Sequence, residues 1–267
     1  MKRILFLVLL VCSAAAQSQT QGLEIELMGG VSIYSGDLNR GLIKPALGVN
    51  VKYRVSPFIS FRGGLTYAQI GGTDKKGSKD DLKLRNLDFQ SSLPEAHLAV
   101  EVNALDVEEF ILYPYAFVGV GVYHIDPYTH DKNGEKTYLH PLSTEGQGLP
   151  SYGSVKPYNL TAFCIPFGGG MKYIATDYIT IGFEAGFRRV FTDYLDDVSR
   201  DYVDEQIVEG NNGRLANAMR DRAAERGYVK FDNGMARGTS TAKDWYMFLN
   251  FTLTRKIVGG KQVCFSF

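Results

Sequence analysis

The chain has 267 residues and a formal net charge of +0 at pH 7, with 29 Gly, 16 Tyr and 16 Phe. This balance leaves no strongly basic surface, so we expect no nucleic-acid partner. No later stretch reaches the run of about 18 apolar residues that marks a transmembrane helix, and the length is within reach of one all-β domain.

Residues 1–16 have the pattern of a secretory signal peptide. Two basic residues are followed by an apolar run from residue 4 to residue 11, and Ala14–Ala16 offers a cleavage site after Ala16. The run is too short to cross a bilayer as a helix, which takes about 20 residues. We therefore expect an exported protein. Cys12 follows Leu-Leu-Val and not small residues, so we do not expect a lipid anchor.

Beyond the signal peptide, apolar and polar residues alternate with a period of two in eight segments. They lie near residues 24–33, 46–55, 61–67, 95–103, 113–123, 163–173, 178–189 and 245–254. Such alternation places one set of side chains on each face of a β-strand. The segment 113–123 is apolar on both faces, so its orientation stays open.

The polar faces of these segments carry five acids and five bases. They are Glu24, Glu26, Lys52, Arg54, Arg62, Glu95, Glu101, Lys172, Glu184 and Arg188. A tilted strand of about 9–11 residues crosses a bilayer. Inside an eight-stranded barrel there is room only for side chains, so charges there must pair. The pattern predicts an all-β fold, an eight-stranded antiparallel transmembrane β-barrel whose lumen holds these ten residues as a charge network, with His97 as a further member.

The connectors alternate in length. Residues 35–43, 71–88, 124–159 and 190–244 form long ones, and residues 56–58, 105–109 and 176–177 form short ones. Outer-membrane barrels have long extracellular loops and short periplasmic turns. We therefore expect an integral outer-membrane protein, with the barrel in residues 17–257, a periplasmic C-terminal tail in residues 258–267, and both termini in the periplasm.

The most acidic stretch is FTDYLDDVSRDYVDE, Phe191–Glu205, in the last long connector. It lacks the D-x-[DN]-x-[DN]-G spacing of a calcium loop. A rim hydrolase that acts on lipopolysaccharide or peptides and uses Asp196, Asp197 and His140 is one interpretation, since acid–base catalysis needs such groups. Arg188, Arg189 and Arg200 lie next to the acids, and charge runs in surface loops usually lie in water, so we expect a solvated or structural role here.

The same connector contains GRLANAMRDRAAERG, Gly213–Gly227. Leu215, Met219 and Ala223 repeat every four residues, which predicts a short amphipathic helix across the rim. We expect it to pack on neighbouring loops, and a partner site is the alternative.

Four stretches carry a family resemblance: YSGDL (Tyr34–Leu38), HPLSTEGQGLP (His140–Pro150), IPFGGGMKY (Ile165–Tyr173) and FRRVFTDYLDDVS (Phe187–Ser199). With the similar spacing to DWYMF (Asp244–Phe248), they make the chain resemble the small outer-membrane barrels of Bacteroidota that include PorG, a type IX secretion component. The resemblance covers essentially the whole mature chain. It implies a non-enzymatic role, in which the barrel helps to hold a periplasmic ring of PorK- and PorN-like proteins at the outer membrane.

For the remaining candidate residues we expect structural roles and not binding or catalysis. His124, His130 and His140 lack zinc spacing, so we expect no metal, and no catalytic residue, cofactor or small-molecule substrate is predicted. The three glycines at 168–170 fit a barrel wall and not a phosphate loop, and Pro166 fits a bulge.

Cys264 lies in the C-terminal tail, whereas Cys164 lies near the opposite end of the sixth strand. Since bridged cysteines need Cα atoms within about 7 Å, we do not expect them to pair. In an oxidising compartment Cys264 can instead crosslink to a periplasmic partner, and an idle thiol is the alternative. A surface adhesin and a small porin are further candidate functions.

Overall fold

The computed structural model describes residues 22–76 and 79–257. The predicted signal peptide and C-terminal tail lie outside the described residues. Eight long strands make up most of the structure: β1 (Gly22–Ser35), β3 (Ile43–Arg54), β4 (Ile59–Thr73), β5 (Asp88–Asn103), β6 (Leu112–His124), β9 (Thr161–Thr176), β10 (Ile179–Val190) and β11 (Trp245–Ile257).

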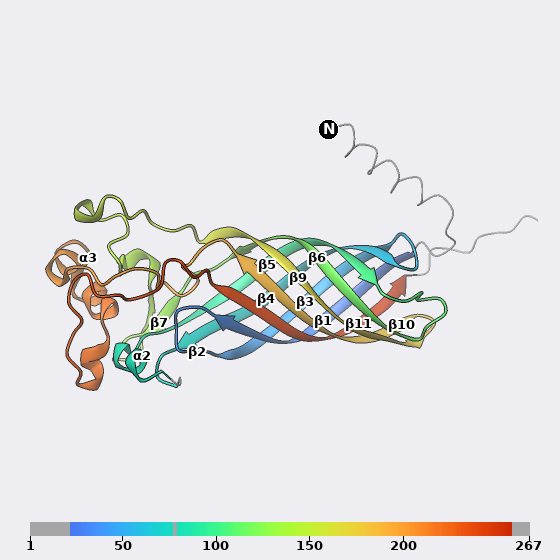
Figure 1. Cartoon of the computed structure of the whole chain (residues 1–267), viewed down its shortest axis with the longest axis horizontal. Coiled ribbons are helices and arrows are strands. Elements are labelled where there is room, and N and C mark those ends of the chain that lie inside the picture. Colours follow the sequence, from blue (N-terminus) through green and yellow to red (C-terminus); the bar gives the residue numbers. More distant parts are fainter. Residues whose placement is uncertain (1–21, 77–78, 258–267) are drawn as a thin grey trace, which may run out of the picture.

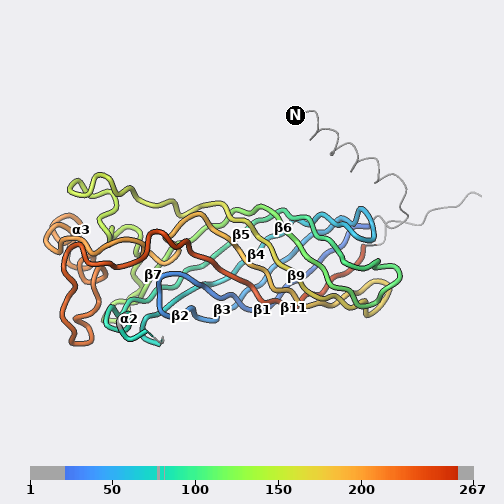
Figure 2. The backbone as a smooth tube through the Cα atoms, in the orientation of Figure 1, coloured from blue at the N-terminus to red at the C-terminus, as the bar shows by residue number. Residues whose placement is uncertain are grey.

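These strands close into a ring. Each pairs antiparallel with its neighbours in the order β4, β3, β1, β11, β10, β9, β6, β5, and β4 pairs with β5 to complete the circle. Closure gives the backbone groups of every strand a partner on both sides. Figure 1 shows the resulting elongated barrel, and Figure 2 traces its path. The predicted eight-stranded antiparallel barrel is confirmed.

The connectors separate into two ends. Residues 55–58, 104–111 and 177–178 form the short-turn mouth, beside which β1 begins and β11 ends. At the opposite end, long connectors carry β2 (Arg40–Gly41), α2 (Asp80–Arg85), β7 (Tyr128–His130), β8 (Lys136–Tyr138), α3 (Glu205–Arg220) and the short helices η1 (His140–Leu142), η2 (Pro150–Tyr152) and η3 (Ala223–Arg226). We call this end the loop cap.

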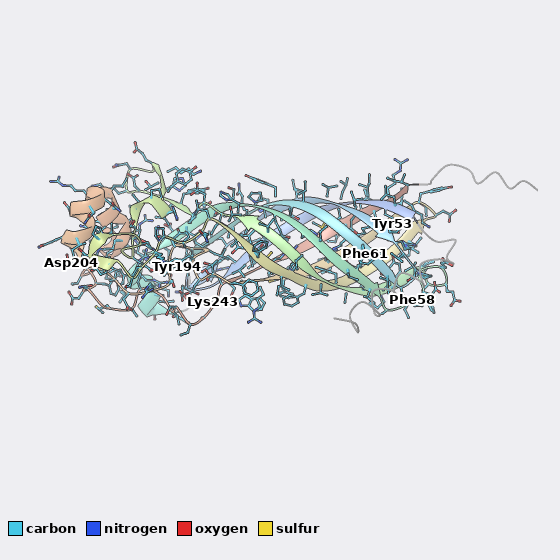
Figure 3. The ribbon with its side chains drawn as sticks, turned by 90° about the horizontal axis from the view of Figure 1, so that it is seen from above. Tyr53, Phe58, Phe61, Tyr194, Asp204 and Lys243 are labelled. Carbon is cyan, nitrogen blue, oxygen red and sulfur yellow. The ribbon has the colours of Figure 1, made fainter. Side chains whose placement is uncertain are left out.

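The outer wall is apolar. Leu98, Phe163 and Phe251 are 66%, 72% and 73% exposed, and Tyr53 and Phe61 lie on the outside near the short-turn mouth (Figure 3). Exposed apolar side chains around a closed sheet are the signature of an outer-membrane barrel, whose solvent at that surface is lipid. Among the described residues, no helix has the length and apolar content needed to span a membrane.

The structure shows which face of the fifth segment, residues 113–123, points into the barrel. In β6, Tyr113, Tyr115 and Phe117 point inward and are buried, whereas Val118 and Val120 face outward. The inward rings lie against cations: the Arg62 guanidinium is 3.7 Å from the Phe117 ring centroid, and Lys172 Nζ is 3.9 Å from that of Tyr115. Cation–π attraction therefore explains why an aromatic face belongs to a charged lumen.

The prediction of a β-bulge at Pro166 was wrong. The β6–β9 pairing runs from Val118 opposite Phe167 to Gly121 opposite Cys164, so the register is unchanged across the proline. The ladder lacks the pairs between these two points, because proline has no N–H to donate. The missing donor is thus accommodated without an extra residue.

The predicted rim helix also differs from the observed one. α3 starts at Glu205, because the Asp204 side chain accepts hydrogen bonds from the backbone N–H groups of Gln206 and Ile207. A break at Gly213 (φ 82°) divides it. The four-residue repeat assumed one helix from Gly213 to Gly227, but α3 ends at Arg220 and Ala223 belongs to η3. Of the three repeat residues, Met219 and Ala223 are buried and Leu215 is exposed.

Prediction. Phe251→Arg should lower the free energy of unfolding by about 2–4 kcal/mol, because it places a cation near the middle of the lipid-facing wall. Urea titration of the barrel in lipid vesicles measures this change. The matched control is Leu215→Arg, since Leu215 is exposed on the loop cap. Equal losses for both variants would contradict a lipid-facing Phe251.

Candidate functional site

The lumen next to the short-turn mouth holds a chain of ion pairs. Lys52 Nζ contacts Glu26, and lies 3.1 Å from Glu101 Oε2. Lys172 Nζ contacts the other oxygen of Glu101. All four side chains are at most 4% exposed. The two acids and the two bases therefore neutralise one another. The Glu26 carboxylate also accepts a hydrogen bond from Thr254 Oγ1.

Deeper in the lumen, Arg62 joins this chain to Glu184. Arg62 Nη1 lies 2.6 Å from Glu184 Oε2 and 3.5 Å from Glu101 Oε2. Tyr115 Oη donates to the same Glu184 oxygen at 2.8 Å. Charge-assisted hydrogen bonds of this kind are the strong ones in a dry interior.

A second cluster lies nearer the loop cap. Arg188 Nε is 3.2 Å from Glu95 Oε2, His97 Nδ1 is 3.2 Å from Glu95 Oε1, and Tyr246 Oη donates to Glu95 at 2.8 Å. At the short-turn mouth, Arg54 pairs with Glu24. The structure thus places all ten predicted lumenal charges inside the barrel, each in at least one ion pair, and it places His97 among them.

Glycine in the wall makes room for these side chains. A Cβ added at Gly186 would lie 2.4 Å from Arg188 Nη1 and 3.1 Å from Phe117 Cζ. A Cβ added at Gly170, the last of the three wall glycines, would lie 3.0 Å from Tyr115 Cε1. Here the lumen has no space for even one more methyl group.

Between the charged clusters and the loop cap, the lumen becomes apolar. Tyr34, Ile70, Phe89, Leu195 and Phe248 belong to one buried cluster that spans the upper barrel and the loops. The Phe248 ring also covers Arg188, with 4.2 Å between the guanidinium carbon and the ring centroid. The lumen is therefore charged toward the short-turn mouth and filled by a hydrophobic core toward the loop cap.

Half of the carboxylates in the acidic stretch Phe191–Glu205 are buried, so a solvated role is wrong for them and a structural one fits; Asp201 is exposed, and Asp204 and Glu205 are half-buried. Asp193, Asp196 and Asp197 are 3%, 1% and 0% exposed. Leu195 and Val198, placed among these acids, enter the apolar cluster and pull the stretch inward. The apolar residues between the acids could have indicated that this part of the stretch is buried, but the high content of carboxylates pointed to solvent instead.

Hydrogen bonds satisfy the buried carboxylates of Asp196 and Asp197. Asp196 accepts from Tyr34 Oη and from the Val198 N–H, and Asp197 accepts from Thr144 Oγ1 and from Tyr158 Oη at 2.9 Å. A carboxylate buried without a countercharge needs such donors.

Glu145 and Arg237 connect the long loops. Glu145, buried, accepts from the backbone N–H groups of Ser199 and Arg200, and Arg237 Nη1 lies 2.8 Å from its Oε1. Arg85 Nη1 donates to the Arg237 carbonyl. The resembling stretches HPLSTEGQGLP and FTDYLDDVS thus bind each other, and YSGDL contributes Tyr34 to the same contact region.

Burial shifts the titration of this acidic cluster. It raises the pKa of Asp193 and of Asp197 to about 6, and that of Asp244 to about 8. Asp37 lies close enough to raise the pKa of Asp193 and Asp244 further. Desolvation disfavours the charged carboxylate, and at Asp244 the Lys243 cation offsets only part of this effect.

The histidine needed by a rim hydrolase does not meet the acids. His140 Nε2 is 2.9 Å from the Tyr158 carbonyl, and its ring packs edge-on against the Tyr158 ring at 4.6 Å between centroids. Tyr158 thus stands between His140 and Asp197. Within residues 22–76 and 79–257, no three His, Cys, Asp or Glu side chains are grouped as a metal site would require.

Of Cys164 and Cys264, the structure describes only Cys164. Cys164 is buried in the wall, with its Sγ 3.6 Å from Tyr246 Oη. Cys264 and the cleavage site after Ala16 lie outside the described residues, so the intermolecular disulfide stays a prediction.

A family model described as Domain of unknown function (DUF6089) matches residues 2–144. No curated protein sequence matches the chain. Similar solved structures include the Neisserial surface protein A (9% identity, 88% of this chain and 97% of that one, TM-score 0.44). Ail of Yersinia pestis (6%, 89% and 99%, 0.43) and OprG from Pseudomonas aeruginosa (9%, 87% and 95%, 0.44) are similar too. At such values these likenesses carry no functional inference.

Prediction. Arg188→Met should lower the free energy of unfolding by about 3–5 kcal/mol, because it leaves the Glu95 carboxylate buried without its base. The double variant Arg188→Met/Glu95→Gln should recover most of that loss, since removing both charges is nearly neutral. Urea titration in vesicles measures both. A double variant as unstable as the single one would show that pairing is not the determining interaction.

Prediction. The loop cap should become more stable as pH falls from 8 to 5. The folded pKa values of Asp193, Asp197 and Asp244 lie above the ordinary 3.8, so the folded cap binds protons more tightly than the unfolded loop. Their contribution is complete below pH 3.8 and is lost as pH rises through about 6 and then about 8.

Hydrogen exchange at the Leu195 amide, which donates to Asp244, reports this stability once intrinsic rates are divided out. Asp244→Asn keeps an acceptor but cannot titrate, so it should flatten the upper part of the pH dependence. An unchanged slope in that variant would refute the assignment to Asp244.

Proposed function

The chain belongs to the family described as Domain of unknown function (DUF6089), and for this member we propose a non-enzymatic role as a membrane anchor. In this proposal the barrel holds or organises the periplasmic ring of a type IX secretion system at the outer membrane. Its partners would be PorK- and PorN-like ring proteins, met at the short-turn mouth, which then faces the periplasm. The long loops would face the exterior.

The observation that carries the proposal is the filled lumen. Charged side chains pair across it from Glu24 to Arg188, an apolar cluster closes it above, and the interlocked loops cover the end. A barrel filled in this way supports transport poorly, and the balanced charges offer no selective path to an ion. Its function therefore belongs to its outer surfaces.

The short-turn mouth is a suitable surface for a partner. Phe58, Phe110, Ile111 and Tyr178 are 45%, 46%, 63% and 55% exposed at or beside its turns. Phe58 projects from the first short turn (Figure 3). Aromatic side chains are enriched among the residues that anchor protein interfaces. The resemblance to PorG-like barrels supports the same surface.

A surface adhesin is the second candidate. It is favoured by apolar side chains on the loop cap, where Val229 is 90% exposed and Tyr228, Met235 and Leu215 are exposed as well. The rim hydrolase is less well supported, because the carboxylates of Asp196 and Asp197 are engaged by hydroxyl donors and His140 contacts neither.

Prediction. Extraction of the tagged full-length protein from native membranes in mild detergent should recover the ring proteins by mass spectrometry. Phe58→Ser should reduce that recovery about tenfold, since loss of an interface anchor costs 1–2 kcal/mol or more. Leu215→Ser, at the other end, should leave recovery unchanged.

Two results would overturn the anchor. Recovery of no ring protein from the unmodified chain would remove the role in secretion. Loss of partners only in Leu215→Ser would assign binding to the loop cap and favour the adhesin.

A further inference from the structure

Three hollows on the outer wall of the barrel join into one continuous trough. Their volumes are about 650, 540 and 500 Å³. The first two share Ala96 as a lining residue, and the last two share Gly63. The trough lies over β3, β4, β5 and β6, from His124 at the loop-cap end to Phe61 near the short-turn mouth (Figure 3). We call it the wall trough.

Small side chains form the floor of the wall trough. Gly63 of β4 and Ala96 of β5 face outward, while Leu65 and Leu98 rise beside them and are 63% and 66% exposed. A Cβ added at Gly63 would lie 3.0 Å from Leu98 Cδ2, so the glycine keeps this space open. Association within lipid depends on van der Waals packing, and small residues let two surfaces approach closely. The wall trough therefore fits a projecting apolar surface inside the membrane.

The opposite wall of the same barrel projects aromatic rings. In the ring of strands, the β10–β11 pair lies across from the β4–β5 pair, with β3 and β1 on one side and β6 and β9 on the other. Phe183 and Phe251 meet edge-on with 5.7 Å between ring centroids, and Phe167 lies 5.8 Å from Phe187 and 6.1 Å from Trp245. We call these five residues the aromatic ridge. Its most exposed ring, Phe251, is 73% exposed.

The wall trough and the aromatic ridge lie at similar depths. Counted from the short-turn mouth, Gly63 is the fifth residue of β4 and Leu98 the sixth residue of β5. Counted in the same way, Phe183 is the fifth residue of β10 and Phe251 the seventh residue of β11. Two copies that share one orientation in a membrane therefore present the ridge of one at the height of the trough of the other.

The charges at the mouth end of the two surfaces are complementary. Glu109 is exposed in the turn that joins β5 to β6, at the foot of the wall trough, and Arg255 is exposed on β11, at the foot of the aromatic ridge. Neither side chain pairs with an opposite charge in the part of the chain that the structure describes. A lipid acyl chain can fill the trough but offers no cation to Glu109, whereas a second copy offers Arg255. Such complementarity favours one partner and fixes its register.

We propose that the wall trough receives the aromatic ridge of a second copy of this chain, so that the barrels associate side by side in the outer membrane. The contact joins two different surfaces, and because these lie on opposite walls it repeats into a row of barrels. In an isolated barrel both surfaces face lipid. The short-turn mouth and the loop cap stay free for other partners, so the contact is independent of the anchoring role.

Disulfide formation between two labelled positions tests the contact. In a Cys264→Ser background, Ala96→Cys places a thiol in the wall trough, and Ala185→Cys places one between Phe183 and Phe187 on the aromatic ridge. Full-length copies with one or the other thiol, distinguished by a tag, are mixed in vesicles of dioleoylphosphatidylcholine. Copper phenanthroline accepts two electrons as each disulfide forms, and the two thiol protons leave. The mixed dimer should form about tenfold faster than either homodimer, because the contact raises the local concentration of the two thiols.

Leu27→Cys is the matched control. Leu27 is exposed on β1, between the two surfaces, and is the sixth residue of its strand from the short-turn mouth. Its mixed dimer with Ala185→Cys should form no faster than the homodimers. Equal rates for all pairs would overturn the proposal, because random collision in lipid has no preference. A fastest homodimer of Ala96→Cys would overturn it too, since that product indicates a symmetric pair.

Filling the trough gives a second measurement. Energy transfer between copies labelled through Leu215→Cys on the loop cap, again with Cys264→Ser, reports their association in the same vesicles. Ala96→Trp should lower this transfer about fivefold, because its ring occupies the space that the ridge needs. Leu27→Trp should leave it unchanged. Both side chains point outward from the filled lumen, and heat-dependent migration on a gel verifies that each barrel is folded. Unchanged transfer in a folded Ala96→Trp barrel would show that the copies do not meet at the trough.

Discussion

Pairing of charges across a narrow lumen is the constraint on which the rest of this barrel depends. An eight-stranded interior holds side chains and little else, so an acid there must find its base at contact distance or remain buried and unpaired. Arg62, between Glu101 and Glu184, shows the solution, because it joins three strands through one guanidinium. A slip of one residue in any strand would turn such a charge toward lipid. Charge pairing thereby fixes the register of the whole sheet.

The lumen is built from two different kinds of interior. Near the short turns, ion pairs and the rings of Tyr115 and Phe117 fill the space. Near the long loops, Phe248 and its neighbours form an ordinary apolar core. Tyr246 links the two, because its hydroxyl donates to Glu95 while its ring belongs to the apolar cluster. The upper core gives the loops something to pack on, which a wholly charged lumen would not.

The apolar cluster near the long loops explains how the loop cap folds. Leu195 and Val198 bury themselves in it, and the acids between them must follow. Each of these acids is then met by hydroxyl donors from elsewhere in the chain, Asp196 by Tyr34 of β1 and Asp197 by Tyr158 of another loop. The motifs that carry the family resemblance are largely these contacts. They therefore describe a closed end, and the filled barrel leaves its outer surfaces as the place for function.

The sequence by itself determined the barrel. A period of two is a local property, so it revealed the eight strands, the alternating connectors and the ten inward charges without any knowledge of distant contacts. It did not reveal which charges pair, because Arg62 and Glu184 are 122 residues apart. Only the tertiary structure decided the fate of the acidic stretch, where Tyr34 meets Asp196 across 162 residues. Burial depends on what the chain packs against, and a run of carboxylates has the same local pattern whether water or another loop surrounds it.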